Sequence, residues 1–370
     1  MSQDKLNLLN FSTKSLKNLF SGMGEKPFRA AQIIKWIHRH GVTDFEEMTD
    51  LSKSLRLKLS EVAEVVPPKV VLSKPSLDGT HKWLIQMADG NCIETVYIPE
   101  GNRGTLCISS QVGCILNCSF CSTGKQGFNR NLTVAEIIGQ LWVAVRNLSE
   151  EAGVHDRKVT NVVMMGMGEP LMNYDNLIPA LELMMDDYAY GLSKRRVTVS
   201  TSGVVPRMYD LLNDIDVSLA VSLHAVNDEL RNVLVPINKK YNVAELLEVC
   251  KLYADKGPQK SLTFEYTLIA NENDSIEHAR ELVSVLKDVP CKINLIPFNP
   301  YPGSGYKKPS NNQIHRFKNY LIEHDYIATI RKTRGDDIDA ACGQLVGSVK
   351  DKTRRNARYL KSLEKEKDEA

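Results

Sequence analysis

The sequence predicts an α/β protein in which a partial (βα)6 barrel follows a small N-terminal accessory domain of helices and a β-hairpin. Two patterns support this prediction. After about residue 104, short apolar runs rich in β-branched residues alternate with segments of helical periodicity, as expected for repeated βα units. Polar or glycine-rich residues follow five of these runs, which is where the strands of a βα barrel carry their chemistry.

The first hundred residues have a different pattern. Apolar residues repeat at helical spacing within residues 27–40, and a second helix is expected over residues 52–62. Strand-like pieces follow at residues 83–87 and 91–98, and an Asp-Gly pair between them is a strong signal for a tight hairpin turn. We therefore expect helices followed by a hairpin, in a module distinct from the barrel.

Seven strands are expected after residue 100, and several are nearly continuous hydrophobic stretches, as in parallel strands covered on both faces. They are residues 105–109, 159–165, 196–200, 216–223, 261–269, 292–297 and 328–331. The clearest helix begins at Thr133, which forms a capping box with Glu136. We assign residues 1–100 to the accessory domain, residues 101–345 to the barrel and residues 346–370 to a charged C-terminal helix or tail.

The polar residues at the strand ends favour a barrel over a doubly wound sheet, because they would all meet at one mouth. A cysteine loop follows the first strand. The other four sets are Gly166–Pro170 after the second strand, Ser200–Gly203 after the third, Ser222–His224 at the end of the fourth and Phe298–Pro300 after the sixth.

The cysteine loop carries Cys114, Cys118 and Cys121 in the spacing C-x3-C-x2-C, with no fourth cysteine nearby. A structural zinc site takes four ligands, and an ordinary iron–sulfur cluster takes four cysteines. Three thiolates therefore favour a [4Fe–4S] cluster with one iron left open for chemistry. The alternative is a zinc site completed by a histidine, although the nearest ones, His81 and His155, lie far away in the sequence.

The composition, 42% hydrophobic and 25% charged residues, is ordinary for a soluble globular protein. No stretch approaches the roughly 18 apolar residues of a membrane span, and the N-terminus does not resemble a signal peptide. We therefore expect a cytoplasmic protein with no membrane partner. Eight cysteines in a reducing compartment indicate metal or catalytic roles rather than a disulfide framework. The net charge of +2 neither demands nor excludes a nucleic-acid partner.

These motifs together resemble the radical S-adenosylmethionine (SAM) superfamily. The aromatic Phe120 before the last cysteine matches its cluster signature, and Met167-Gly-Glu-Pro170 is similar to its GGEP motif, with Met in place of the first Gly. The closer resemblance, over nearly the whole chain, is to the RlmN/Cfr family of RNA adenine methyltransferases. The run at residues 331–345, which includes Arg-Gly-Asp-Asp-Ile-Asp-Ala-Ala-Cys, is highly specific to that family.

The resemblance implies a radical-SAM barrel that methylates C2 of an adenine in 23S rRNA and in tRNA, with a [4Fe–4S] cluster and two SAM molecules per turnover. A radical route suits this reaction because the SAM methyl group and adenine C2 are both electrophilic. The resemblance assigns Cys342 as the methyl carrier, which becomes covalently linked to the RNA. It assigns Cys107 to resolving that adduct through a transient disulfide with Cys342, and Glu94 as the base that removes the C2 proton.

The same resemblance implies SAM contacts at the strand ends. Gly168 and Glu169 would contact the amino group, and Asn299 the adenosyl part. The residues expected at the carboxylate or ribose are Ser200, Ser222, Leu223 and His224. We also expect a reducing electron donor, which by analogy with the superfamily would be of the flavodoxin type. The N-terminal domain is expected to position the RNA, and the protein is expected to be a monomer.

Each assignment has an alternative. Without the family context, Cys342 and Cys107 would be buried packing residues, Glu94 a solvent-facing acid, and His224 a satisfied core histidine. Cfr-type methylation of adenine C8 would use the same cysteines. A hypothesis of a different class is an RNA-binding or assembly protein in which the cysteines hold a structural metal.

Overall fold

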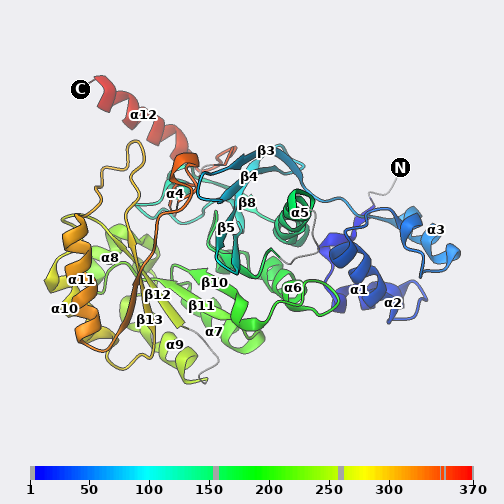
Figure 1. Ribbon diagram of the computed structural model, residues 1–370, viewed down its shortest axis with the longest axis horizontal. Coiled ribbons are helices and arrows are strands. Elements are labelled where there is room, and N and C mark those ends of the chain that lie inside the picture. Colours follow the sequence, from blue (N-terminus) through cyan, green and yellow to red (C-terminus); the bar gives the residue numbers. More distant parts are fainter. Residues whose placement is uncertain (1–4, 153–157, 257–261, 342, 346, 369–370) are drawn as a thin grey trace.

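The computed structural model describes residues 5–152, 158–256, 262–341, 343–345 and 347–368. Its centre is a sheet in the order β14-β13-β12-β11-β10-β9-β6-β5-β4-β3, covered on the outside by helices (Figure 1). The N-terminal helices lie at one end of the molecule and α12 projects from the opposite end (Figure 1). Among the described residues, no helix has the length and apolar character needed to cross a membrane.

The N-terminal domain is a small helical unit. Its elements are β1 (Leu6–Asn7), α1 (Thr13–Gly22), α2 (Arg29–Ile34), a π-helical segment (Lys35–His40), α3 (Lys53–Val62) and β2 (Ala63–Glu64). Ser12 caps α1 and Ser52 caps α3, each hydroxyl accepting a hydrogen bond from a backbone N–H in the first turn. The predicted helix at residues 27–40 is confirmed as α2 with its π-helical extension, whose apolar face is buried.

The predicted parallel strands are confirmed. They are β6 (Arg103–Cys107), β9 (Asn161–Met164), β10 (Val197–Thr201), β11 (Ser218–Ser222), β12 (Leu262–Leu268), β13 (Lys292–Pro297) and β14 (Ile327–Ile330). Each pairs in parallel with its neighbour in chain order. The sheet order has β14 and β3 at its two ends, so the predicted partial barrel is the observed architecture.

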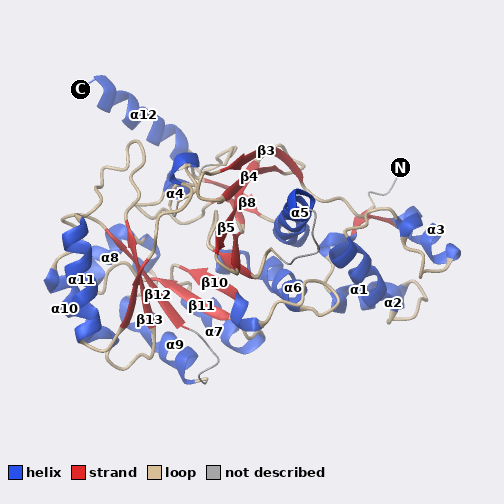
Figure 2. Cartoon of the chain, viewed as in Figure 1, coloured by secondary structure: helices blue, strands red, loops and turns tan. Residues whose placement is uncertain are grey.

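Helices connect the parallel strands and cover the sheet (Figure 2). They are α5 (Val134–Ala152), α6 (Tyr174–Met185), α7 (Val205–Asp214), α8 (Asp228–Leu234), α9 (Val243–Asp255), α10 (Ile276–Leu286) and α11 (Asn311–Glu323). The predicted capping box at the start of α5 is present, because Glu136 N donates to Thr133 Oγ1 and Thr133 N donates to Glu136 Oε2. Ile137, Ile138 and Leu141 on α5 are fully or almost fully buried.

The hairpin consists of β4 (His81–Gln86) and β5 (Cys92–Glu100), preceded by β3 (Lys69–Pro75). From its sequence this hairpin was expected to belong with the N-terminal helices, whereas in the structure it extends the barrel sheet. The reason is the tight turn after Glu100, which brings β5 into an antiparallel ladder with β6 from Glu100↔Arg103 to Val96↔Cys107. The domain boundaries proposed from the sequence remain predictions.

The cysteine loop and the C-terminus lie beside each other. The loop contains β7 (Gln111–Gly113), α4 (Ser122–Lys125) and β8 (Phe128–Asn131), and β7 pairs with β8. The helix α12 (Arg355–Asp368) begins next to α4 and extends away from the body (Figure 1).

Candidate active site at the barrel mouth

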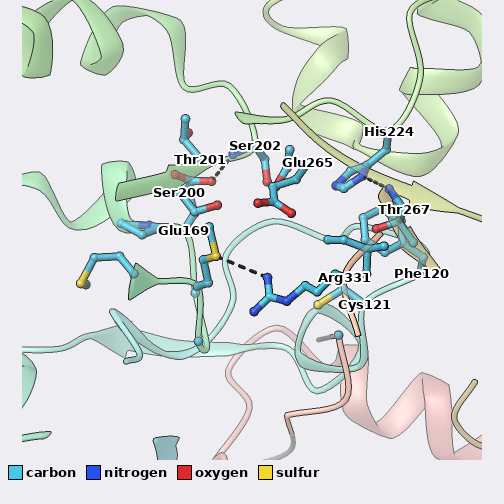
Figure 3. Close-up of a pocket in the computed structure, with 18 of the residues that line it drawn as sticks. Phe120, Cys121, Glu169, Ser200, Thr201, Ser202, His224, Glu265, Thr267 and Arg331 are labelled. Carbon is cyan, nitrogen blue, oxygen red and sulfur yellow. Dashed lines mark hydrogen bonds between the residues drawn. The ribbon is translucent and has the colours of Figure 1, made fainter. Parts of the chain in front are cut away.

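A pocket opens at the carboxyl ends of the parallel strands, where the sequence predicted the chemistry (Figure 3). The predicted SAM ligands that line it are Gly168, Glu169, Ser200, Ser222, His224 and Asn299. Cys121 and Phe120 of the cysteine loop form part of its wall. Leu223 is different, because its side chain is fully buried in the core and its backbone bonds to Glu265 and Arg231.

The loop after β9 has a fixed backbone. Gly168 has φ +99°, and a Cβ there would lie 2.5 Å from Gln111, so only glycine fits without a rearrangement. Glu169 N donates to Gln111 Oε1. The Glu169 carboxylate accepts from Ser202 N at 2.8 Å and from Leu171 N at 3.2 Å, and burial raises the pKa of this carboxyl. The acidic group is therefore held in place before any ligand binds.

Arg231 is a buried residue beside the pocket that was not expected there from the sequence. Its fully buried guanidinium donates to the carbonyls of Ser202, Ser222 and Leu223 and to Asn238 Oδ1. Burial lowers its pKa to about 10, so the group stays charged at neutral pH. It thereby connects the end of β10 to the end of β11. Arg231 lies in the middle of a short amphipathic helix, and nothing in the local pattern distinguishes it from a surface arginine.

His224 connects the pocket to the cysteine loop. It has φ 59°, its Nδ1 accepts from Thr267 N at 2.9 Å, and its ring meets Phe120 edge-on with the centroids 4.6 Å apart. Burial, together with the charge of Arg231, lowers its pKa to about 3. The ring is therefore neutral near pH 7, and because Nδ1 accepts, its proton resides on Nε2.

Two charged residues that the sequence analysis did not assign to the site, Glu265 and Arg331, stand in the same pocket (Figure 3). Glu265 is buried on β12 and accepts from Asn294 Nδ2 at 3.0 and 3.2 Å. Burial raises its pKa, while Arg331 and the Asn294 hydrogen bond act in the opposite direction. Arg331 Nη1 also lies 3.8 Å from Met165 Sδ. An acidic residue inside the apolar strand was the available sequence signal for Glu265.

The three cysteines of the loop suit a thiolate-bound cluster by donor type and spacing. Burial raises the pKa of each thiol, to about 12 for Cys118, and for Cys114 and Cys118 the neighbouring cysteines and Glu169 add to the increase. Bringing these thiolates together therefore requires a cationic partner. Within the described residues, no three histidine, cysteine or acidic side chains already converge as a metal site, so the fit rests on the donor set.

The C-terminal segment is attached to this loop on its outer side. Arg355 of α12 donates to Cys114 O at 2.5 Å, to Leu116 O at 2.8 Å and to Gly124 O at 3.2 Å. Further contacts run from the loop to the segment, namely Ser122 N to Gly343 O, Thr123 Oγ1 to Leu345 O and Gln126 Nε2 to Gly347 O. The segment that follows position 342 is therefore fastened to the cysteine loop.

Cys107 and Glu94 lie on the face of the sheet that lines the barrel interior. Cys107 pairs with Val96 on β5 and with Val163 on β9, and paired residues on adjacent strands project to the same side. Val163 lines a second cavity inside the barrel, and Glu94 lies two positions from Val96, on the same face. Both Cys107 and Glu94 are buried.

Cys342 lies outside the described residues, but its chain neighbours are placed. Ala341 lines the interior cavity, and Gly343 lines the pocket at the mouth. The two cavities share Met165, Glu265, Ile296, Asn299 and Arg331. The roles assigned to Cys107, Glu94 and Cys342 from the sequence remain predictions.

Comparison with known proteins gives two family matches. Residues 6–65 match the family model of the ribosomal RNA large subunit methyltransferase N-terminal domain, and residues 108–283 match the radical SAM superfamily. Curated relatives include the dual-specificity RNA methyltransferase RlmN of Francisella tularensis subsp. novicida (strain U112). It is 66% identical over 365 residues, which cover 98% of each chain. The protein of the same name from Francisella tularensis subsp. mediasiatica (strain FSC147) is similar to the same extent.

Among solved structures, the chain is similar to a radical SAM methyltransferase from Sphaerobacter thermophilus. The two share 41% sequence identity with a TM-score of 0.85, over 92% of this chain and 99% of the other. This similarity confirms the predicted fold class, a radical-SAM barrel with a small N-terminal domain.

Proposed function

The chain belongs to the RlmN family of radical SAM RNA methyltransferases, and on this premise we propose that it methylates C2 of an adenine in 23S rRNA and in tRNA. The observation that carries the proposal is that the pocket at the mouth and the interior cavity adjoin each other and share lining residues. All the predicted SAM ligands except Leu223 line the pocket, and the interior cavity lies beside Cys107 and Glu94. In the sequence, Cys342 stands between Ala341, which lines the interior cavity, and Gly343, which lines the pocket.

The family implies a [4Fe–4S] cluster and SAM as cofactors. Cys114, Cys118 and Cys121 would hold the cluster, and Gly168, Glu169 and the other strand-end ligands would hold SAM. When bound, these groups supply an electron and a 5′-deoxyadenosyl radical. The pocket contributes fixed polar groups, since Glu169 and the backbone near Ser202 and Ser222 are held by internal hydrogen bonds.

In the proposed route, the Cys342 thiolate attacks the methyl carbon of a first SAM, so that an S–C bond forms and S-adenosylhomocysteine leaves. Transfer of one hydrogen atom from the S-methyl group to the 5′-deoxyadenosyl radical would give 5′-deoxyadenosine and a methylene radical, which would form a C–C bond to adenine C2. Loss of one electron to the electron carrier and of the C2 proton to Glu94 restores the aromatic ring. Two SAM molecules are consumed in each turnover.

Cys107 then releases the product. Its sulfur attacks the Cys342 sulfur, an S–S bond forms and the S–C bond breaks, and the departing carbon takes a proton to become the methyl group. An external dithiol must reduce the resulting disulfide before the next turnover. The target adenine has to leave its stack to reach the barrel mouth, so unpaired adenines suit the reaction.

The remaining parts of the proposal concern partners. The N-terminal domain would position the RNA, an electron carrier of the flavodoxin type would reduce the cluster, and the protein would act as a monomer. The cytoplasm is the expected compartment, because its reducing conditions keep the thiols available.

The proposal is tested by digesting RNA treated with the reconstituted enzyme and identifying the methylated nucleoside by mass spectrometry. We expect 2-methyladenosine. With methyl-deuterated SAM, the product should retain two deuterium atoms, because the transferred carbon passes through a methylene group. A main product of 8-methyladenosine would indicate Cfr-type chemistry, and retention of all three deuterium atoms would exclude the route through Cys342.

A further inference from the structure

A buried ion pair lies beside the predicted base. Lys82 Nζ on β4 is 3.0 Å from Glu94 Oε1 on β5, and the two side chains are only 10% and 7% exposed. Lys82 pairs with Val96, so Glu94 is its diagonal neighbour on the same face of the sheet. Lysine and glutamate are seldom buried unless they are paired, because an uncompensated charge is costly away from water.

The same ammonium group contacts the chain that leads to Cys342, residues 335–341, which we call the Cys342 segment. Lys82 Nζ donates to Asp339 O at 3.1 Å, and Asp339 has a left-handed backbone with φ 52°. Asp339 lies three positions before Cys342 in the sequence. Lys82 therefore bridges the Glu94 carboxylate and the chain that leads to the methyl carrier.

Neighbouring contacts hold both sides of this bridge. On one side, Asp78 Oδ2 of the turn between β3 and β4 accepts from Gly335 N at 3.1 Å, which fixes the start of the Cys342 segment. On the other side, Glu94 O accepts from Ser109 Oγ at 2.7 Å, and Ser109 Oγ accepts from Met167 N at 2.9 Å. The backbone of Glu94 is thus joined to the loop with the predicted SAM ligands, and its side chain to the Cys342 segment.

We propose that Lys82 is a positioning residue, which keeps the Glu94 carboxylate ionised and fixes it relative to the Cys342 segment. This inference rests on the proposed function, in which Glu94 accepts the C2 proton. A buried carboxylate without a cation beside it would take up a proton and could no longer act as a base. The ammonium group opposes this, and its second bond, to Asp339 O, sets the separation between base and carrier segment.

The test compares the variants Lys82→Met, Lys82→Arg and Glu94→Gln with the double variant, using reconstituted enzyme and the RNA substrate. The rate of 2-methyladenosine formation is measured together with the intact mass of the protein, which reports S-methylation of Cys342. Lys74→Met is the matched control, because Lys74 is the exposed residue opposite Lys82 on β3. S-methylation does not use Glu94, so it reports whether a variant is folded and binds SAM.

We expect Lys82→Met to lower the rate about tenfold, the loss that one charge-assisted hydrogen bond supports. S-methylation should be unchanged, Lys82→Arg should recover part of the rate, and Lys74→Met should match the wild type. Because Lys82 acts through Glu94, the double variant should be no slower than Glu94→Gln.

Results that contradict these expectations would distinguish a wrong role for Lys82 from a wrong role for Glu94. A full rate for Lys82→Met beside a slow Glu94→Gln would overturn the inference while leaving the proposed function intact. Multiplying effects in the double variant, or parallel loss of S-methylation in Lys82→Met and Lys82→Arg, would show that Lys82 only supports the fold. A full rate for Glu94→Gln would overturn the catalytic role of Glu94, and the role of Lys82 with it.

Discussion

Replacing Arg231 with methionine should damage both stability and SAM binding. The guanidinium satisfies four acceptors: the Leu223 carbonyl and the Asn238 amide oxygen, which are buried, and the carbonyls of Ser202 and Ser222, which are partly buried. Each buried acceptor left without a donor costs about 1–3 kcal/mol. Methionine removes the desolvation cost of the guanidinium itself, and water can reach some of the acceptors. A net loss of about 3 kcal/mol in the free energy of unfolding remains.

The assay is thermal unfolding of the metal-free protein, followed by equilibrium dialysis of SAM with the reconstituted protein. A loss of about 3 kcal/mol lowers the unfolding midpoint by about 4 °C in a chain of 370 residues. The SAM affinity should fall at least about tenfold, since Ser202 and Ser222 line the pocket and Arg231 holds their carbonyls. Arg316→Met on the exposed face of α11 is the control, and it should change stability by less than about 0.5 kcal/mol.

An Arg231→Met variant that unfolds within about 1 °C of the wild type and binds SAM normally would contradict both expectations. Reduced stability with normal SAM affinity would restrict Arg231 to a role in the fold, and would show that the strand ends hold their geometry without it.

Three further predictions follow from the same contacts. Arg355→Met removes the donor to three carbonyls of the cysteine loop. The amides of this loop should therefore exchange hydrogen at least about fivefold faster in the metal-free protein, and less iron should be retained after reconstitution. An unchanged exchange rate would contradict this prediction. Burial lowers the pKa of His38 from 6.5 to about 3, so the unfolded state binds more protons and stability falls as the pH falls below 6.5. At pH 5 this contribution is about 2 kcal/mol, and the pH dependence of urea unfolding should be weaker in His38→Gln; parallel curves would contradict it. Cys107→Ala should leave protein covalently attached to RNA, seen as a ribonuclease-sensitive shift in gel electrophoresis, and clean release of methylated RNA would remove Cys107 from the proposed route.

The strands of the barrel were predictable because each depends on a local pattern. Parallel strands that are covered on both faces have nearly continuous apolar sequences. The observed bounds of β13 coincide with the predicted ones, and the bounds of the other strands differ by a few residues. The capping box of α5 is likewise a property of neighbouring residues. The pairing of the hairpin with β6 was not predictable in this way, because it depends on contacts between strands rather than on the pattern within one.

The residues of the candidate site likewise fall into those that the sequence predicted and those that only the structure revealed. The predicted SAM ligands follow strand ends, so their convergence follows from the topology of parallel strands. Arg231, Glu265 and Lys82 were not assigned, because a charged residue within a helix or strand is usually exposed. Only their burial and their partners distinguish them from solvated surface charges.

By itself, the sequence determined the three-thiol loop, the order of strands and helices, and the family. These are properties of spacing and periodicity, which survive without knowledge of contacts between distant residues. The tertiary structure decided that the hairpin with Glu94 joins the barrel, and that Lys82 links this carboxylate to the Cys342 segment. It also decided that the C-terminal segment fastens to the cysteine loop. The physical reason is that such pairings depend on sheet register and burial, which arise only when segments far apart in the chain pack together.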